Sequence, residues 1–387
     1  MKFAASHLSY CTNIHPAESW QATQTMLASH VLAVRDSLRA SGHLGLDEPF
    51  AIGLRLSAVA ARELLEGDHL GRFREWLAAT NTYVFTINGF PYGSFHGTRV
   101  KEQVFRPDWT DPARLEYTKD LFRILAAIAH PDISASVSTL PGSFKSFGAD
   151  EAIIRKQLIE LTGFLDELSD VSGHDFHLGL EPEPLGYFEN TIETVAFFQR
   201  LCHLAPDASA IRRRIGLNYD SCHFALEYDD AHNAFKLFGF AGIRISKIHL
   251  SSALAFDPND PAAIAAIRAF NEPTYFHQVL LRRADDSIRR FQDLPDFFQA
   301  LDDGRIRAVD FLEARVHFHI PLDAEPTAPL RSTRGETLKV LDWRRAHPDA
   351  CQHYEIETYT WGVLPGSLQR PVTEQIAGEY QWVLANA

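Results

Sequence analysis

Two residues near the middle of the chain, Asp220 and His223, place a carboxylate and an imidazole at the end of a predicted strand. The apolar segment from Ile215 to Tyr219 predicts a buried strand that stops where the sequence changes to Asp-Ser-Cys-His. On a continuing strand, side chains three positions apart would point to opposite faces. If the strand ends at Asp220 and the chain bends across its tip, the two side chains converge into a clamp for a cation. Cys222 lies between them, and we expect its thiol to point away.

Two other strand-like segments carry an acidic residue or a histidine at the same place. Glu181 ends an apolar run and is followed two positions later by Glu183, so both lean to one side if the extended path continues. His249 interrupts the apolar segment KIHLSS. Taken singly, the glutamates have a simpler interpretation as exposed loop residues, and His249 as a buried histidine with satisfied hydrogen bonds. Taken together, Glu181 and His249 are candidate metal ligands.

Two pairs with a spacing of two occur in the last quarter of the chain. His317 and His319 stand in VHFHIPL, where an extended path places both imidazoles on one side. That arrangement favours metal binding, although a packed strand whose histidines bond to backbone carbonyl groups is the alternative. Glu355 and Glu357 share one face of EIETY, and Glu357, nearer the carboxyl end of the predicted strand, is the better candidate ligand.

The order of predicted elements explains how such distant residues could meet. Apolar strand-like segments alternate with helical segments along most of the chain, which is the pattern of a parallel sheet with helical crossovers. Eight such units favour a closed (β/α)8 TIM barrel over an open doubly wound sheet. The predicted strands cover residues 8–14, 50–56, 83–89, 133–140, 177–184, 215–219, 245–252 and 353–361.

The barrel prediction turns separate weak signals into one candidate metal site. Active sites of such barrels lie at the carboxyl ends of the strands. Carboxylates combined with imidazoles suit Zn, Mn, Fe or Co, whereas Mg prefers oxygen ligands. His15 and His96 follow the first and third predicted strands and are further candidates, or pocket-lining residues. The predicted ligands of a divalent transition metal are Glu181, Asp220, His223, His249, His317, His319 and Glu357.

One region is too long for a simple strand-helix unit. Between His249 and Glu357 lie a short helical piece, two β-prone runs that resemble a hairpin, and another helix. We interpret residues 253–315 as an insertion after strand seven, within a single barrel domain that covers residues 1–387. At that position an insertion would lie over the barrel mouth and act as a lid.

Composition excludes several other classes of protein. The 387-residue chain has a net charge of −13, which disfavours a general nucleic-acid surface because duplex binding depends on phosphate neutralisation. The four cysteines show neither CxxC spacing nor the density of a disulfide scaffold. No amino-terminal signal peptide and no apolar run of membrane-spanning length is evident. We therefore expect a soluble cytoplasmic protein.

The same motifs resemble a known superfamily. NYDSCH is similar to the Asp-x-x-His motif of xylose isomerase-like barrels, which include sugar isomerases, epimerases and the endonuclease IV group. LEPEP, KIHLSS and EIETY resemble the segments that supply their glutamate, histidine and terminal glutamate ligands. VHFHIP takes the place of the Asp-x-His pair of the nucleases, with His317 in the position of the aspartate. HLSYCTNIHPAESW and EIETYTWGVLP look like the EboE family of bacterial metabolite-traffic proteins, which are encoded with a prenyltransferase-like partner.

The resemblance implies an enzyme that acts on a small molecule. The first hypothesis is a metal-dependent isomerase or epimerase of a small polyhydroxylated or phosphorylated metabolite, with Glu181 and Glu357 exchanging protons with the substrate carbon. The second is a multinuclear phosphoesterase or an iron oxygenase, and the third is a non-catalytic escort protein in metabolite export. Contact with a membrane prenyltransferase-like partner follows from the EboE resemblance. Arg55, Arg99 and Lys247 are candidates to hold an anionic substrate group.

Overall fold

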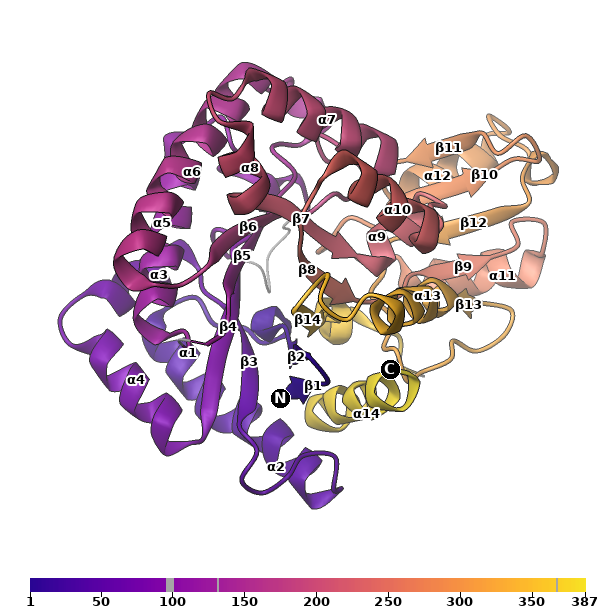
Figure 1. Cartoon of the computed structure of the whole chain (residues 1–387). Coiled ribbons are helices and arrows are strands. Elements are labelled where there is room, and N and C mark those ends of the chain that lie inside the picture. Colours follow the sequence, from indigo (N-terminus) through magenta and orange to yellow (C-terminus); the bar gives the residue numbers. More distant parts are fainter. Residues whose placement is uncertain (95–100, 131, 367) are drawn as a thin grey trace.

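A closed ring of eight parallel strands forms the centre of the computed structural model, which describes residues 1–94, 101–130, 132–366 and 368–387 (Figure 1). Around the ring, the sheet order is β2-β14-β8-β7-β6-β5-β4-β3, and a parallel bridge between Cys11 and Gly53 joins β2 to β3. The predicted (β/α)8 barrel is therefore confirmed. The barrel strands are β2 (Ser6–Tyr10), β3 (Phe50–Arg55), β4 (Thr82–Asn88), β5 (Ala135–Thr139), β6 (Phe176–Leu180), β7 (Ile215–Asp220), β8 (Ile245–Leu250) and β14 (His353–Ile356), and β1 (Lys2–Phe3) pairs antiparallel with β2.

Helices connect successive strands on the outside of the ring. Their starts follow local sequence signals: the side chains of Ser19, Asp111 and Asp150 accept hydrogen bonds from the first backbone N–H groups of α1, α5 and α6. The helices are α1 (Trp20–Met26), α2 (Leu32–Ala40), α3 (Ala58–Leu65), α4 (His69–Ala79), α5 (Pro112–Ile128), α6 (Glu151–Ser172), α7 (Thr191–Leu204), α8 (Ala208–Arg214), α9 (Ser221–Leu226), α10 (Ala231–Ala241), α13 (Arg334–Ala346) and α14 (Val372–Asn386), with a π-helical turn, η2 (Leu27–Val31), between α1 and α2.

Short 3₁₀ turns, four of them after barrel strands, shape the loops. They are η1 (Thr12–Ile14), η3 (Lys101–Phe105), η4 (Lys145–Phe147), η5 (Arg268–Phe270), η6 (Ala308–Asp310) and η7 (Tyr359–Val363). In the described residues, no helix is both long enough and apolar enough to cross a membrane.

The bend after β7 is a helical turn that Asp220 itself begins. Asp220 is the last residue of β7 and the N-cap of α9, where its Oδ1 accepts from the backbone N–H groups of Cys222 (2.7 Å) and His223 (3.2 Å). The strand therefore stops where the sequence predicts. The capping geometry brings His223 back across the strand tip, beside Asp220.

The insertion after β8 is a compact unit with its own antiparallel sheet, seen in orange beside the barrel in Figure 1. The predicted hairpin is present as β10 paired with β11, and residues 283–287 join the two strands. The sheet continues to Ser332, well beyond the boundary we expected at Arg315, which lies inside β12. The insertion contains β9 (Leu254–Phe256), α11 (Pro261–Ile267), β10 (Val279–Arg282), β11 (Ile288–Phe291), α12 (Leu294–Asp302), β12 (Glu313–Val316) and β13 (Arg331–Ser332).

Contacts with the loop after α9 hold the insertion against the barrel. The hydroxyl group of Tyr228 lies 3.0 Å from the carbonyl oxygen of Leu280 and 2.9 Å from that of Glu313. The Arg315 guanidinium lies 4.1 Å from the centre of the Tyr228 ring, and Arg290 forms an ion pair with the buried carboxylate of Glu227. The insertion is thus anchored directly behind the turn that carries Asp220 and His223.

Candidate metal centre

Four of the predicted ligands form one cluster at the carboxyl ends of adjacent barrel strands. One ligand atom each of Glu181, Asp220, His249 and Glu357 lies within 4.8 Å of the other three. Nδ1 of His249 is 2.9 Å from Glu357 Oε2, 3.2 Å from Glu181 Oε1 and 3.5 Å from Asp220 Oδ2. All four side chains are buried. We call these four residues the first cluster.

The strand ends themselves fix this cluster. Glu181 follows the last residue of β6 and continues its ladder, because its backbone N–H donates to Thr139 (2.9 Å). Glu357 follows β14 in the same way and donates to the carbonyl group of Leu250 (3.1 Å). Both glutamates therefore stand one step beyond the packed strands, where side chains can face the barrel mouth.

The charges of the first cluster fit a bound cation. Burial alone would raise the pKa of Asp220, but His223, His319 and His249 hold it well below its usual range. Burial would lower the pKa of His249, yet Glu357 and Glu181 raise it well above its usual value. The second oxygen of Asp220, Oδ2, is buried without a hydrogen-bond partner among the described residues. Because an orphaned buried carboxylate oxygen is costly, a cation would supply the missing partner.

Three more predicted ligands form a second cluster, which consists of His223, His317 and His319. Each Nδ1 faces a carbonyl oxygen: His223 faces Pro182 (3.0 Å), His317 faces the side chain of Gln278 (2.7 Å), and His319 faces the backbone of Glu357 (2.8 Å). The Gln278 amide is oriented by its own donation to the carbonyl group of Pro184 (3.1 Å). We therefore assign the proton of each imidazole to Nδ1, which leaves a lone pair on each Nε2.

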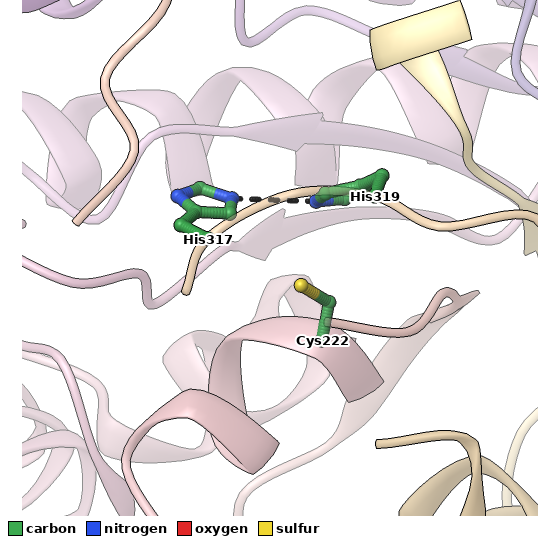
Figure 2. A group of neighbouring side chains, drawn as sticks. All are labelled: Cys222, His317 and His319. Carbon is green, nitrogen blue, oxygen red and sulfur yellow. Dashed lines mark hydrogen bonds between the residues drawn. The ribbon is translucent and has the colours of Figure 1, made fainter. Parts of the chain in front are cut away.

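The lone pairs of the second cluster point to a cation. His317 and His319 face each other, as Figure 2 shows, with their Nε2 atoms 3.3 Å apart. Two imidazole lone pairs in such contact repel unless a proton or a metal ion lies beside them. Burial lowers the pKa of both His223 and His317, which favours the neutral form that binds metals. Asp220, a member of the first cluster, also has a ligand atom within 4.8 Å of those of His223 and His319, so it connects the two clusters.

Cys222 does not point away from this region, contrary to expectation. Its thiol is directed toward the histidine pair in Figure 2, and its Sγ lies within 4.8 Å of ligand atoms of His317 and His319. The backbone N–H of Phe318 donates to the sulfur, while burial raises the pKa of the thiol well above its usual value. The helical turn of α9 rotates Cys222 toward the insertion, which a simple bend would not do.

Three asparagines that the sequence did not single out orient the glutamates. Asn13 (2.8 Å) and Asn88 (3.2 Å) donate to Oε1 of Glu357, and Asn218 donates to Oε2 of Glu181 (2.7 Å). Asn218 stands two residues before Asp220 and Asn88 ends a strand, so the same strand-end pattern could have indicated them. The oxygens that these amides do not contact, Oε1 of Glu181 and Oε2 of Glu357, face Nδ1 of His249.

The remaining predicted residues lie elsewhere. His15 is buried against Tyr10 (3.1 Å) and stacks on His30, and neither of the two clusters includes it. Arg55 is paired with Glu18 and bonds to the carbonyl group of Ala17. Lys247 lies inside the barrel with no exposed surface. His96 and Arg99 lie outside the described residues.

A pocket lies over the two clusters, with walls from both the barrel and the insertion. Glu181, Glu183, His223, His317 and Glu357 face it. The rest of its lining is largely aromatic or apolar, and Tyr275, Phe276 and Gln278 come from the insertion. The other lining residues are Asn13, Asn88, Phe90, Pro91, Lys101, Val104, Phe105 and Tyr359. The insertion thus contributes to the site both a candidate ligand and part of the wall.

Comparisons with known proteins find similarity only at the level of solved structures. No protein-family model and no curated protein sequence matches the chain. The probable 3-DHS dehydratase AsbF from Bacillus anthracis has a TM-score of 0.45 and 11% identity, with 97% of each chain covered. The IolI protein with a bound zinc atom has a TM-score of 0.40 and 12% identity, over 64% of this chain and 73% of that chain. A xylose isomerase domain protein from Alicyclobacillus acidocaldarius subsp. acidocaldarius has a TM-score of 0.36 and 13% identity, over 64% and 73%.

Proposed function

We propose that this protein is a metal-dependent isomerase or epimerase of a small metabolite that carries adjacent oxygen atoms. The observation that carries the proposal is that Glu181 (3.2 Å) and Glu357 (2.9 Å) both approach His249 Nδ1 and both line the pocket. In the barrel, β6 and β14 are separated by β7 and β8, so the two glutamates approach the centre from different walls. Two carboxylates in that arrangement can remove a proton from one face of a carbon atom and return it to the other.

The residues of the first cluster would hold Zn, Mn, Fe or Co, since the donor set mixes carboxylates with an imidazole. Such an ion acts as a Lewis acid that polarises a carbonyl group. Glu357 is suited to proton transfer because burial raises its pKa above the usual value, toward the range where a carboxyl group can both give and take a proton. Asn13 and Asn88 hold its Oε1, so Oε2 is the atom that faces the centre.

The shape of the pocket also bears on the substrate. The insertion covers the clusters with Tyr275 and Phe276, which would keep water from a reactive carbanion. Lys101, a cation on the wall, is paired with Asp293. Arg55 is likewise paired with Glu18, and Lys247 is buried inside the barrel. Because these three cations of the described residues are engaged or buried, we favour a polyhydroxylated substrate over a phosphorylated one. Metabolite traffic in the cytoplasm, with a membrane prenyltransferase-like partner, is the role that the EboE resemblance adds.

Solvent exchange tests the proposal directly. Metal-loaded protein would be incubated in D₂O with D-fructose, D-xylulose and dihydroxyacetone, and loss of the C–H signal beside the carbonyl group followed by NMR. We expect exchange with the wild-type protein and none with Glu357→Gln, while Glu374→Gln, an exposed acidic residue on α14, serves as the control. Exchange that is equally fast in Glu357→Gln, or absent from wild-type protein with every probe, would contradict the proposal.

A second candidate function is a two-metal phosphoesterase, and one observation favours it. Asp220 lies within reach of ligand atoms of both clusters, and a carboxylate between two ions is suited to clamp a phosphoester. Metal content separates the candidates. About one ion per chain supports the isomerase, whereas two or three support the hydrolase or an iron oxygenase. A non-catalytic escort protein would bind its metabolite without any turnover.

A further inference from the structure

Lys247 and Glu355 form a charged pair inside the barrel, one layer below the first cluster. Lys247 stands two residues before His249 on β8. Glu355 stands on β14, two residues before Glu357, which directly follows the end of that strand. Side chains two apart on a strand share one face, so the pair points into the barrel like the ligands above it. Neither Lys247 nor Glu355 has any exposed surface.

Glu355 holds the ring nitrogen of His249 that faces away from the first cluster. Oε2 of Glu355 accepts from His249 Nε2 (2.9 Å) and from the ammonium group of Lys247. Lys247 also donates to the hydroxyl group of Ser138 (3.1 Å). Because the carboxylate requires a proton on Nε2, Nδ1 is the nitrogen left to act as a ligand, and it is the one that faces Glu181, Asp220 and Glu357.

The two groups contact each other directly inside the barrel. The ammonium group of Lys247 is paired with Oε2 of Glu355, and both side chains are fully buried. The ammonium group therefore offsets the charge of the carboxylate beneath the metal ligands.

A pair of this kind is an inefficient way to stabilise a barrel core. Well-packed apolar residues commonly replace a buried ion pair without loss of stability, since desolvation offsets the attraction between the charges. Strand β3, which β2 separates from β14 in the ring, also leaves room for the pair: a Cβ atom at Gly53 would overlap with Oε1 of Glu355. We therefore look for the role of the pair in His249, the candidate metal ligand that Glu355 contacts.

We propose that Glu355 and Lys247 are positioning residues that fix the tautomer and orientation of His249 for metal binding through Nδ1. The inference rests on the proposed metal centre. Glu355 keeps the proton of His249 on Nε2 by accepting a hydrogen bond from it. Lys247 orients the side chain of residue 355 through its own contact with the same oxygen. Carboxylates that orient metal-binding histidines commonly change metal affinity by about 10- to 100-fold when removed.

Cobalt binding to four variants tests this role, with Co²⁺ as the probe and its visible absorption as a readout that does not depend on activity. In Glu355→Gln, Lys247 would attract the amide oxygen and turn the NH₂ group toward His249, which favours the wrong tautomer. We expect Co²⁺ affinity to fall about 10- to 100-fold, with an altered spectrum. In Lys247→Met/Glu355→Gln the amide oxygen is free to face Nε2, so affinity should recover. In Lys247→Met/Glu355→Leu no acceptor remains, and affinity should stay low.

The two uncharged double variants decide the question even if Glu355→Gln does not fold. Glu374→Gln, on the exposed face of α14, controls for loss of one negative charge, and melting temperatures report stability separately. Equal Co²⁺ affinity in the two double variants would overturn the positioning role, as would wild-type affinity in a folded Glu355→Gln. Wild-type protein that binds no Co²⁺ would instead overturn the metal centre of the proposed function.

Discussion

Asp220 is the residue on which both clusters depend. Its Oδ1 caps α9, while its Oδ2 is buried between His249 (3.5 Å) and His223 (4.0 Å) without a hydrogen-bond partner among the described residues. One oxygen thus serves the fold and the other is available to a cation. These two roles of its oxygens explain why a fully buried carboxylate is present at the end of this strand.

Replacing Asp220 with alanine should therefore remove bound metal from a protein that remains folded. The capping bonds to α9 are lost as well, which costs about 1 kcal/mol of the free energy of unfolding. Elemental analysis after purification without chelator, together with circular dichroism, measures both effects. Full metal content in a folded Asp220→Ala protein would show that the ligand assignment is wrong.

At the scale of elements, the carboxyl-terminal helix α14 secures the end of β14 through one buried acid. Glu379 Oε1 accepts from the hydroxyl group of Thr358 (2.6 Å) and from the backbone N–H of Leu322 (3.1 Å). Thr358 directly follows the candidate ligand Glu357. Burial raises the pKa of Glu379 from 4.5 to about 7.

This raised pKa predicts how stability depends on pH. The folded protein holds the proton of Glu379 that the unfolded chain has lost, so stability from this group is present below about pH 4.5 and is lost as the pH rises through about 7. Glu379→Gln should unfold like wild type at pH 5 and be more stable at pH 8, by on the order of 1 to 3 kcal/mol. Urea unfolding with chelator present measures this, and exposed Glu374→Gln is the matched control. A wild-type pH profile in Glu379→Gln would contradict the prediction.

The insertion is the second element with a testable role. We predict that it acts as a lid, and its hairpin turn at residues 284–287 is exposed, whereas the barrel strands are buried. Limited proteolysis should cut first near Ala284–Ser287, and a ligand that closes the pocket should slow the cut. Tyr228→Phe, which removes the hydroxyl contact with β10 and β12, should speed it. If the first cleavage falls between Leu178 and Phe224 instead, the assignment of the insertion as a lid is wrong.

At the scale of the whole molecule, the barrel and the insertion together make the candidate metal region. The barrel supplies the first cluster and His223, while the chain that leaves β12 supplies His317 and His319. Gln278, next to β10, orients His317, and the backbone of Glu357 orients His319. The second cluster therefore forms only when the insertion packs on the barrel.

A double variant, His317→Ala/His319→Ala, separates the three interpretations of this pair. If two ions are bound, one should be lost and the other kept by the first cluster. A single-ion isomerase would keep its metal and lose substrate affinity or rate. Unchanged metal content combined with a large fall in melting temperature would exclude the two-metal interpretation and leave a structural role for the histidines.

Much of the candidate site follows from the sequence because the candidate ligands of the first cluster stand at strand ends. In a parallel barrel all carboxyl ends meet at one mouth, so Glu181, Asp220, His249 and Glu357 can be placed together once the strand order is predicted. The spacing of His317 and His319 likewise indicates that both face one side. Local periodicity is enough for such conclusions.

Only the tertiary structure decides which atoms face each other, since side-chain orientation depends on contacts between distant segments. His319 is oriented by the backbone of Glu357, and His249 by Glu355, more than a hundred residues away. The rotation of Cys222 depends on Asp220 capping α9, and the end of the insertion depends on β13 pairing with β9. The contacts of His319, His249 and β13 join segments far apart in the chain, so sequence periodicity carries no record of them. The Asp220 cap is local, but strand periodicity does not show how the helical turn orients Cys222.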